Sequence, residues 1–334
     1  MDVCRILLTR SMAPGDIQYL RDKMDPAVAG RYEFIVPEAY DEESLCALAG
    51  DADVLLGPYV TPEILKRAGK LKLIQVPWTG MDTFDFSAVQ GCRAPVCNTH
   101  SNADSVAEMG LAILLDLLKK VSYHDRKMRA GSWNRDQKPL NLKSRMLGEQ
   151  TVCILGCGNI GYRMAKLIRA FGARVVGVDV YRQPDEVLSA VYPPEKTAEA
   201  LAGAGAVICA LPLTAGTRGL IDDKWIAGMK RGAVLVNMSR AGVMDEDAVY
   251  RALRDGRLAG FGADVWWRAP RRGESESWPS DHNAFWEMDQ VVMSPHRAGF
   301  VEDSLPHLDG AADNLIALIQ GKPLRDRVDT AQQY

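Results

Sequence analysis

Short apolar runs alternate with segments of helical periodicity along most of the chain. The first four runs are RILLT at 5–9, YEFIV at 32–36, DVLLG at 53–57 and LKLIQV at 71–76. Between them we expect helices at 41–49 and 61–69, the second opened by Thr61-Pro62-Glu63 as N-cap and first turn. Strands that alternate with helices predict α/β layers around a parallel sheet.

A second series of the same kind begins at TVCILG and continues through ARVVGVDV, AVICALP, AVLVNMS and AGFGADV. Each run is nearly continuous in apolar residues, as expected of strands that are buried on both faces. Helices are predicted between these strands at 159–171 and 244–255.

The segment between the two series, residues 103–120, is predicted to be a largely buried helix, because its apolar positions cover much of a helical circumference. These positions are 106, 109, 111, 113, 114, 117 and 118. The polar segment 121–150 is expected to be a linker, and 265–288 a long irregular loop.

Composition and charge exclude several classes of function. The 334 residues carry a net charge of −3, with 47% hydrophobic and 25% charged residues. This balance argues against a nucleic-acid or anionic-membrane partner, and no apolar run is long enough to span a bilayer. The first residues do not resemble a signal peptide, so a cytoplasmic location is expected. None of the seven cysteines has Cys-x-x-Cys spacing, so we expect reduced core thiols and no metal site.

A glycine-rich motif predicts the cofactor. The strand TVCIL leads directly into Gly156-Cys157-Gly158-Asn159-Ile160-Gly161, and a helical segment follows. In this setting Gly156 permits a tight turn, Gly158 lets the backbone approach a pyrophosphate, and Gly161 lets the helix pack on the strand. The helix N-terminus at Asn159 and Ile160 would supply N–H donors for the phosphates.

Asp179 ends the next strand, 23 residues after Gly156, close to the spacing of a ribose-binding acid. A carboxylate there accepts ribose hydroxyls and repels a 2′-phosphate, so NAD is predicted in preference to NADP. Arg182 nearby is the feature that would weaken this preference. A flavin or nucleotide-sugar site, or a site that no longer binds a nucleotide, remains the alternative.

Three further motifs stand at the carboxyl ends of predicted strands, where ligands bind in doubly wound sheets. They place Arg240 after AVLVN, Asp264 after AGFGA and His296 within VVMSPHRAG. Taken singly, each residue is as readily explained by a structural role.

In this order the motifs resemble the D-isomer-specific 2-hydroxyacid dehydrogenase family. The resemblance runs from IQVPWTGMD through SNADSVAE, GCGNIG and LPLTAGTRGLID to SPHRAG. It implies two Rossmann- or flavodoxin-like domains with parallel sheets, the nucleotide domain being inserted into the substrate domain. The expected boundaries are 1–100 plus 300–334 for the substrate domain and 101–299 for the NAD-binding domain.

The resemblance also implies roles for single residues. Arg240 matches the arginine that binds the substrate carboxylate and polarises the carbonyl, and His296 matches the general acid/base. Asp264 matches an acid near the nicotinamide carboxamide. Substrate contacts are expected from Trp78, Thr79, Gly80 and Asn102, and the cofactor groove from Leu211, Pro212, Thr217, Met238 and Ser239.

One position departs from the family pattern. The glutamate that the family places five residues after the aspartate, just before a proline, is Ala269 here. Three explanations stay open: an acid of the long loop (Glu274, Glu276 or Asp281) reaches His296, a water takes its place, or the reaction needs no strongly basic histidine.

Two other functions compete with a D-2-hydroxyacid dehydrogenase. The first is a formate- or phosphite-type dehydrogenase. Formate dehydrogenases of the same superfamily also carry DVW and lack the glutamate, whereas phosphite dehydrogenases have a lysine where this chain has Thr79. The second competing function is that of an NAD(H)-sensing, corepressor-like binding protein.

The resemblance implies a homodimer formed through the nucleotide domain. Trp266 and Trp267 either line the active-site cleft or are buried under the 265–288 loop.

Overall fold

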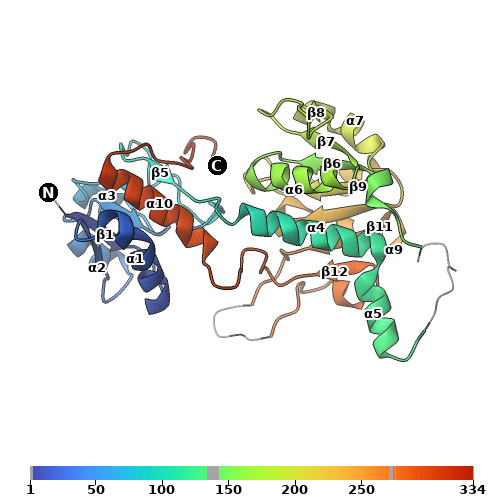
Figure 1. The fold of residues 1–334 in the computed structure, drawn as a ribbon, viewed down its shortest axis with the longest axis horizontal. Helices are drawn as coiled ribbons and strands as arrows, with labels where there is room; N and C mark the ends of the chain where they lie inside the picture. Colours follow the sequence, from blue (N-terminus) through green and yellow to red (C-terminus); the bar gives the residue numbers. More distant parts are fainter. Residues whose placement is uncertain (1–2, 134–142, 271–273, 275, 334) are drawn as a thin grey trace. The chain divides into compact units, whose positions relative to one another are not determined.

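A computed structural model describes residues 3–133, 143–270, 274 and 276–333. The chain divides into two compact units, Met1–Asn102 with Phe300–Tyr334 and, inserted between these segments, Ala103–Gly299 (Figure 1). Each unit is built on one sheet whose strands all pair in parallel. The predicted α/β class with two parallel sheets is therefore confirmed.

The first unit contains a five-stranded sheet of order β2-β1-β3-β4-β5. Its strands are β1 (Cys4–Leu8), β2 (Tyr32–Ile35), β3 (Val54–Leu56), β4 (Leu73–Gln75) and β5 (Val96–Cys97). The strand order reverses between β1 and β3, as it does in flavodoxin-like sheets.

Helices cover both faces of this sheet. Alternate residues of β1 face opposite sides, so Ile6 and Leu8 pack under α1 (Pro14–Val28) and α10 (Pro306–Gln320), whereas Leu7 packs under α2 (Glu42–Ala49) and α3 (Pro62–Arg67). Asn314 of α10 donates to the side-chain oxygen of buried Gln75 at 2.9 Å, which ties the C-terminal helix to β4.

The second unit contains a seven-stranded sheet of order β12-β11-β10-β9-β6-β7-β8. Its strands are β6 (Thr151–Leu155), β7 (Arg174–Val178), β8 (Ala190–Tyr192), β9 (Ala206–Cys209), β10 (Ala233–Asn237), β11 (Leu258–Ala263) and β12 (Val291–Met293). The order reverses between β6 and β9, which is the Rossmann arrangement.

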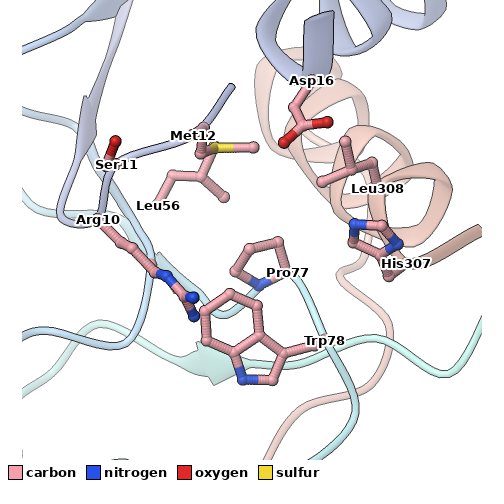
Figure 2. Close-up of a pocket in the computed structure, with 10 residues that line it drawn as sticks. Arg10, Ser11, Met12, Asp16, Leu56, Pro77, Trp78, His307 and Leu308 are labelled. Atoms are coloured by element: carbon pink, nitrogen blue, oxygen red, sulfur yellow. The ribbon is translucent and has the colours of Figure 1, made fainter. Parts of the chain in front are cut away.

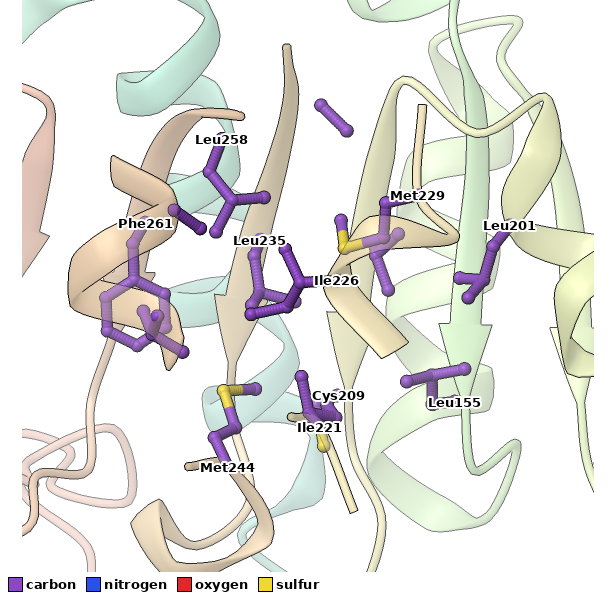
Figure 3. Close-up of a cluster of buried hydrophobic side chains, with 14 of the residues drawn as sticks. Leu155, Leu201, Cys209, Ile221, Ile226, Met229, Leu235, Met244, Leu258 and Phe261 are labelled. Atoms are coloured by element: carbon purple, nitrogen blue, oxygen red, sulfur yellow. The ribbon is translucent and has the colours of Figure 1, made fainter. Parts of the chain in front are cut away.

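The central strands of this sheet are buried on both faces, as their continuous apolar runs predict. On one face Val152 and Ile154 pack beneath α4 (Ala103–Lys119) and α6 (Asn159–Ala170). On the other face Cys153 and Leu155 join the cluster drawn in Figure 3, beneath α7 (Thr197–Ala202), α8 (Asp223–Ala227) and α9 (Glu246–Arg254).

Helix α4 confirms the buried helix predicted at 103–120. Glycines in β11 allow it to lie close to the sheet: a Cβ added at Gly262 would come 2.3 Å from Cγ2 of Ile113, and one added at Gly260 would come 3.0 Å from Cδ2 of Leu117. Much of the apolar surface of α4 is therefore used within its own unit.

The expectation of a linker over 121–150 is wrong for its first part, because Val121–Arg129 forms helix α5. Lys120 adopts a left-handed φ of 58°, which separates α5 from α4. No residue of α5 is buried, and most of its residues are polar, so its apolar positions are too few for hydrophobic periodicity to predict the helix. Asp125 and Arg129 form an i,i+4 ion pair of 2.8 Å, and basic side chains occupy the last turn, where they favour a helix. Residues 134–142 of the expected linker lie outside the described residues.

The expected loop at 265–288 contains a short 3₁₀ turn, η5 (Phe285–Glu287), and the other described residues of this segment form no helix or strand. Part of the loop, residues 271–273 and 275, lies outside the description. All seven cysteines are free, and the thiols of Cys97, Cys153, Cys157 and Cys209 are buried. Among the described helices, none has the length and hydropathy needed to cross a membrane.

Candidate active site

Five loops of the second unit leave the same edge of its sheet. The glycine-rich loop follows β6, Leu211 follows β9, Arg240 follows β10, Asp264 follows β11 and His296 follows β12. Since neighbouring parallel strands lie about 4.8 Å apart, the strands that lead to Arg240 and His296 are separated by roughly 10 Å. This edge includes the topological switch point between β6 and β9, where doubly wound sheets bind their ligands.

Glycine is favoured at each of the three motif positions for a different structural reason. Gly156 has a φ of +82°, and a Cβ there would come 2.9 Å from the carbonyl oxygen of Ala210. A Cβ at Gly161 would come 2.0 Å from the carbonyl oxygen of Gly156, so the helix could not pack on the strand. A Cβ at Gly158 would meet no protein atom within 4 Å. The protein's own packing therefore does not require glycine at position 158. A pyrophosphate that approached the backbone closely would require it.

Helix α6 begins at Asn159, and its N-cap is Gly158, which has no side chain to accept an N–H of the first turn. The donors of Asn159 and Ile160 are thus left for an anionic group. The Cys157 side chain points into the core, where burial raises the pKa of its thiol to about 12. This cysteine therefore contributes packing and not nucleophilic chemistry.

The carboxylate of Asp179 joins the end of β7 to the glycine-rich loop. It accepts the backbone N–H of Cys157 at 2.7 Å, of Tyr181 at 2.8 Å and of Arg182 at 2.9 Å. The Arg182 guanidinium lies 4.1 Å from the centre of the Tyr162 ring and donates to the Cys157 carbonyl oxygen at 3.2 Å. This acid and this arginine therefore both lie beside the glycine-rich loop, at the end of β7.

The remaining residues predicted for the cofactor groove lie in the segments that follow β9 and β10. The Leu211 side chain is within 3.2 Å of a Cβ built at Gly156, and the Thr217 hydroxyl donates to the Pro212 carbonyl oxygen at 2.6 Å. Met238 and Ser239 are buried directly after β10.

Buried Asn237 organises the turn that carries Arg240. Its side-chain oxygen accepts both the N–H and the hydroxyl of Ser239 at 3.0 Å, and its amide donates to the Arg240 carbonyl oxygen at 3.1 Å. The Arg240 guanidinium donates to the Ser239 carbonyl oxygen at 2.9 Å. One side chain at the end of β10 thus determines the backbone path through Arg240.

Asp264 fixes the backbone of the turn that carries His296 by hydrogen bonds. The residue is 2% exposed, and one carboxylate oxygen accepts the Ser294 hydroxyl at 2.5 Å and the N–H of Arg297 at 3.0 Å. The other oxygen accepts the N–H of Ala298 at 2.9 Å. His296, between these anchored residues, is exposed and has a left-handed φ of 54°. The uncommon backbone conformation of His296 is therefore held from both sides by one carboxylate.

Two tryptophans connect the turns of Arg240 and His296. The indole N–H of Trp266 donates to the Ser294 carbonyl oxygen at 2.9 Å, and that of Trp267 donates to the Met244 carbonyl oxygen at 3.1 Å. Trp267 also stacks on Phe285, with ring centres 5.2 Å apart. Both indoles are partly buried against the core cluster, which supports the structural role over a cleft-lining one.

The long loop places its acids near an arginine. Glu274 and Asp281 lie 3.9 and 3.3 Å from the Arg268 guanidinium, and Ala269 is exposed. The loop is further attached to α9 through Asn283, whose amide donates to Asp247 at 2.8 Å.

In the first unit, the predicted substrate turn is held by the segment that follows β5. The Thr79 hydroxyl lies 2.8 Å from the Thr99 carbonyl oxygen and 3.0 Å from the side-chain oxygen of Asn102, and Asn98 donates to the Thr79 carbonyl oxygen at 2.8 Å. Thr79 and Asn102, which lie apart in sequence, are thus brought into contact next to Trp78 and Gly80.

Sequence reasoning overlooked Asn237, Ser294 and the hydrogen-bonding role of Trp266. A signal was available for the first, because an asparagine that ends an apolar run such as AVLVN is a buried polar group that needs partners. The partners of Trp266 and Ser294 arise only from tertiary contact.

The profile of the D-isomer specific 2-hydroxyacid dehydrogenase NAD-binding domain matches residues 111–298, more than half of the chain. This chain belongs to the D-isomer-specific 2-hydroxyacid dehydrogenase family.

Relatives within the family are distant. A glyoxylate reductase of Korarchaeum cryptofilum is 30% identical over 280 residues, which cover 81% of each chain. A D-3-phosphoglycerate dehydrogenase of Methanocaldococcus jannaschii is 30% identical over 279 residues. The match covers 81% of this chain but 50% of that relative, so this chain spans about half the length of the phosphoglycerate dehydrogenase it matches.

Solved structures share the fold of this family member over nearly its whole length. The D-isomer specific 2-hydroxyacid dehydrogenase of Xanthobacter autotrophicus, solved with NADPH and MES, aligns with a TM-score of 0.80 at 23% identity and covers 100% of both chains. The D-lactate dehydrogenase of Aquifex aeolicus, solved with NAD and lactic acid, aligns with a TM-score of 0.75 at 23% identity and covers 95% of this chain and 96% of that one.

The geometry of Asp264 generates a stability prediction. We expect Asp264→Asn to lower the free energy of unfolding by about 1–3 kcal/mol, because the amide nitrogen would face an N–H donor in a buried site. Urea unfolding measures the loss, and hydrogen exchange should show faster exchange at Arg297 and Ala298. Asp281→Asn, on an exposed side chain, is the matched control and should change the free energy by less than about 0.5 kcal/mol. Equal stability of the two variants would contradict the anchoring role.

Proposed function

We propose that this protein transfers a hydride between NAD(H) and C2 of a small D-2-hydroxy acid or 2-oxo acid. The observation that carries the proposal is the placement of Arg240 and His296 after β10 and β12, at the same sheet edge as the glycine-rich loop after β6. Two separate sets of hydrogen bonds, from Asn237 and Asp264, hold these two turns.

Each side chain then has a chemical role. The planar fork of Arg240 suits a carboxylate and would polarise the adjacent carbonyl. His296, exposed at its turn, would give a proton to the developing alkoxide during reduction or remove it during oxidation. NAD supplies the hydride acceptor, and NADH the donor, when bound at the glycine-rich loop.

The two units receive different roles in this proposal. The second unit would bind the dinucleotide through Gly156, Gly158, Gly161 and the first turn of α6. The first unit would hold the substrate carboxylate through the backbone donors of Thr79 and Gly80, whose turn is fixed by Asn98 and Asn102. Asp264 would act chiefly by positioning His296, since three of its four lone-pair directions accept bonds from the 294–298 turn.

The proposed reaction is tested by NADH and NADPH oxidation against a panel of 2-oxo acids, with formate and phosphite tested as hydride donors to NAD. We expect turnover of 2-oxo acids with NADH, and kcat/KM for Arg240→Lys reduced about 10- to 100-fold, because a charged bidentate contact is lost. Arg251→Lys, at a surface ion pair of the same unit, is the control. Oxidation of formate or phosphite with no turnover of any 2-oxo acid would replace the proposal, and tight NADH binding without turnover would favour a sensor.

The preference for NAD is proposed from Asp179, whose carboxylate would lie against the ribose and repel a 2′-phosphate. We expect Asp179→Asn to reduce the ratio of kcat/KM for NADH to that for NADPH by about 10-fold, equivalent to about 1.4 kcal/mol. Steady-state kinetics with both cofactors measure the ratio, and Asp223→Asn, an exposed acid of the same unit, is the control. An unchanged ratio in Asp179→Asn would mean that Arg182 or another group decides the cofactor.

We also propose a homodimer formed by the second unit. Helix α5 has no buried residue, yet Val121 is 62% and Met128 53% exposed, and Met146 beyond it is 59% exposed. Light scattering should give twice the mass of one chain, and Val121→Lys combined with Met128→Lys should shift it toward the monomer. Val36→Lys, at a 53% exposed site of the first unit, is the control. A monomeric wild-type protein would contradict the proposal.

A further inference from the structure

The first unit contains a cavity of about 220 Å³ beside the proposed substrate turn. Pro77 and Trp78, the two residues before Thr79, form part of its lining. The end of β3 and the loops after β1 and β3 contribute Leu56, Arg10 and Gly57, and α10 adds His307 and Leu308. The volume is below the roughly 300–1,000 Å³ of pockets that enclose a drug-sized ligand, so it suits one end of a small molecule.

The position of this cavity in the fold is that of a ligand site. Arg10 follows the carboxyl end of β1 and Gly57 that of β3, and the strand order of this sheet reverses between β1 and β3. In open α/β sheets, ligands bind outside the carboxyl ends of the strands at such a reversal. The cavity therefore stands in the first unit where the glycine-rich loop stands in the second.

One wall of the cavity presents a cation whose hydrogen-bonding edge is available. The Arg10 guanidinium carbon lies 4.9 Å from the centre of the Trp78 ring, and Figure 2 shows the two side chains against each other. Within the described part of the chain, Arg10 has neither an ion pair nor a hydrogen-bond acceptor. Stacking uses the face of the guanidinium and leaves its in-plane N–H groups available to a planar anion.

The opposite wall limits the charge that the cavity accepts. Asp16 and His307 lie there, beside Leu308 (Figure 2). Burial lowers the pKa of His307, with Asp16 and Asp309 opposing that shift, so near neutral pH the imidazole is uncharged. The Asp16 carboxylate accepts the N–H of Ala13 at 3.3 Å at the start of α1. A cavity in which one cation faces one acid suits a ligand group with a single negative charge better than a dianion.

From these observations we propose that the cavity binds the far end of the substrate and that this end carries a second carboxylate. The substrate class is thus a dicarboxylic 2-oxo or 2-hydroxy acid, whose distal carboxylate Arg10 binds while Leu56, Pro77 and Leu308 contact the carbon chain. This inference rests on the proposed function, because it assigns the reacting carboxylate to the adjacent Thr79-Gly80 turn.

The test compares acids of equal chain length that differ only in the distal group. With NADH and the full-length protein, we expect kcat/KM for 2-oxoglutarate to exceed that for 2-oxopentanoate by about 10-fold or more. This factor corresponds to the free energy that one charge-assisted hydrogen bond contributes. Oxaloacetate against 2-oxobutanoate is the second pair, and 3-phosphonooxy-2-oxopropanoate tests a distal phosphate. Ratios near 1, or a preference for the phosphate, would overturn the proposal.

Variants assign the preference to Arg10. Arg10→Met should lower the dicarboxylate-to-monocarboxylate ratio toward 1, and Arg10→Lys, which keeps the charge without the planar fork, should give an intermediate ratio. Arg21→Met is the matched control, because Arg21 also stacks on an aromatic ring, Phe34 at 5.2 Å, but does not line the cavity. A ratio that stays high in Arg10→Met would overturn the assignment, as would an equal loss in Arg21→Met.

A binding measurement separates this inference from the proposed reaction. Calorimetry with glutarate and pentanoate needs no turnover, and glutarate should bind at least about 10-fold more tightly in the wild type but not in Arg10→Met. If no 2-oxo acid is reduced but glutarate binds in this manner, the proposed reaction fails and the cavity assignment stands. If 2-oxo acids are reduced and glutarate shows no advantage, the assignment fails and the reaction stands.

Discussion

The parallel direction of every strand is the constraint on which the rest of this structure depends. Because all strands of a sheet run the same way, the loops that leave their carboxyl ends emerge along one edge, however far apart they lie in sequence. The glycine-rich loop, Arg240 and His296 span some 140 residues of sequence, and they share one edge because the strands that lead to them run parallel. The same constraint brings Arg10, Gly57 and Trp78 together in the first unit.

Buried polar side chains then give these loops their shape. Asn237 and Asp264 stand at the ends of β10 and β11, and each satisfies its hydrogen-bonding groups with the turn that carries a proposed functional residue. A buried carboxylate or amide without such partners would destabilise the protein, so the native fold favours one path for each turn. The scaffold and the site are thus joined by the same hydrogen bonds.

Periodicity and motifs were sufficient for features that rest on burial or on glycine geometry. Helix α4 and the central strands are buried and show it in their apolar patterns, and Gly156 and Gly161 have the conformations and close contacts that their spacing suggests. Helix α5 could not be found in this way, because it buries nothing. The Asp264 and Trp266 contacts with Ser294 escaped the sequence analysis for another reason: they join segments about 30 residues apart and depend on the register of β11 and β12.

The insertion of one unit into the other also affects how the protein can be made. Helix α10 completes the face of the first sheet, where Leu308 and Leu315 pack with Ile6 and Leu8, and Asn314 binds Gln75. A ribosome releases the strands of the first unit well before this helix, and the whole second unit emerges in between. The apolar face beneath α10 therefore stays uncovered during most of synthesis, a period in which nascent chains are exposed to aggregation and to chaperones. The second unit can bury its apolar faces as soon as it has been synthesised, because it is one continuous segment of the chain.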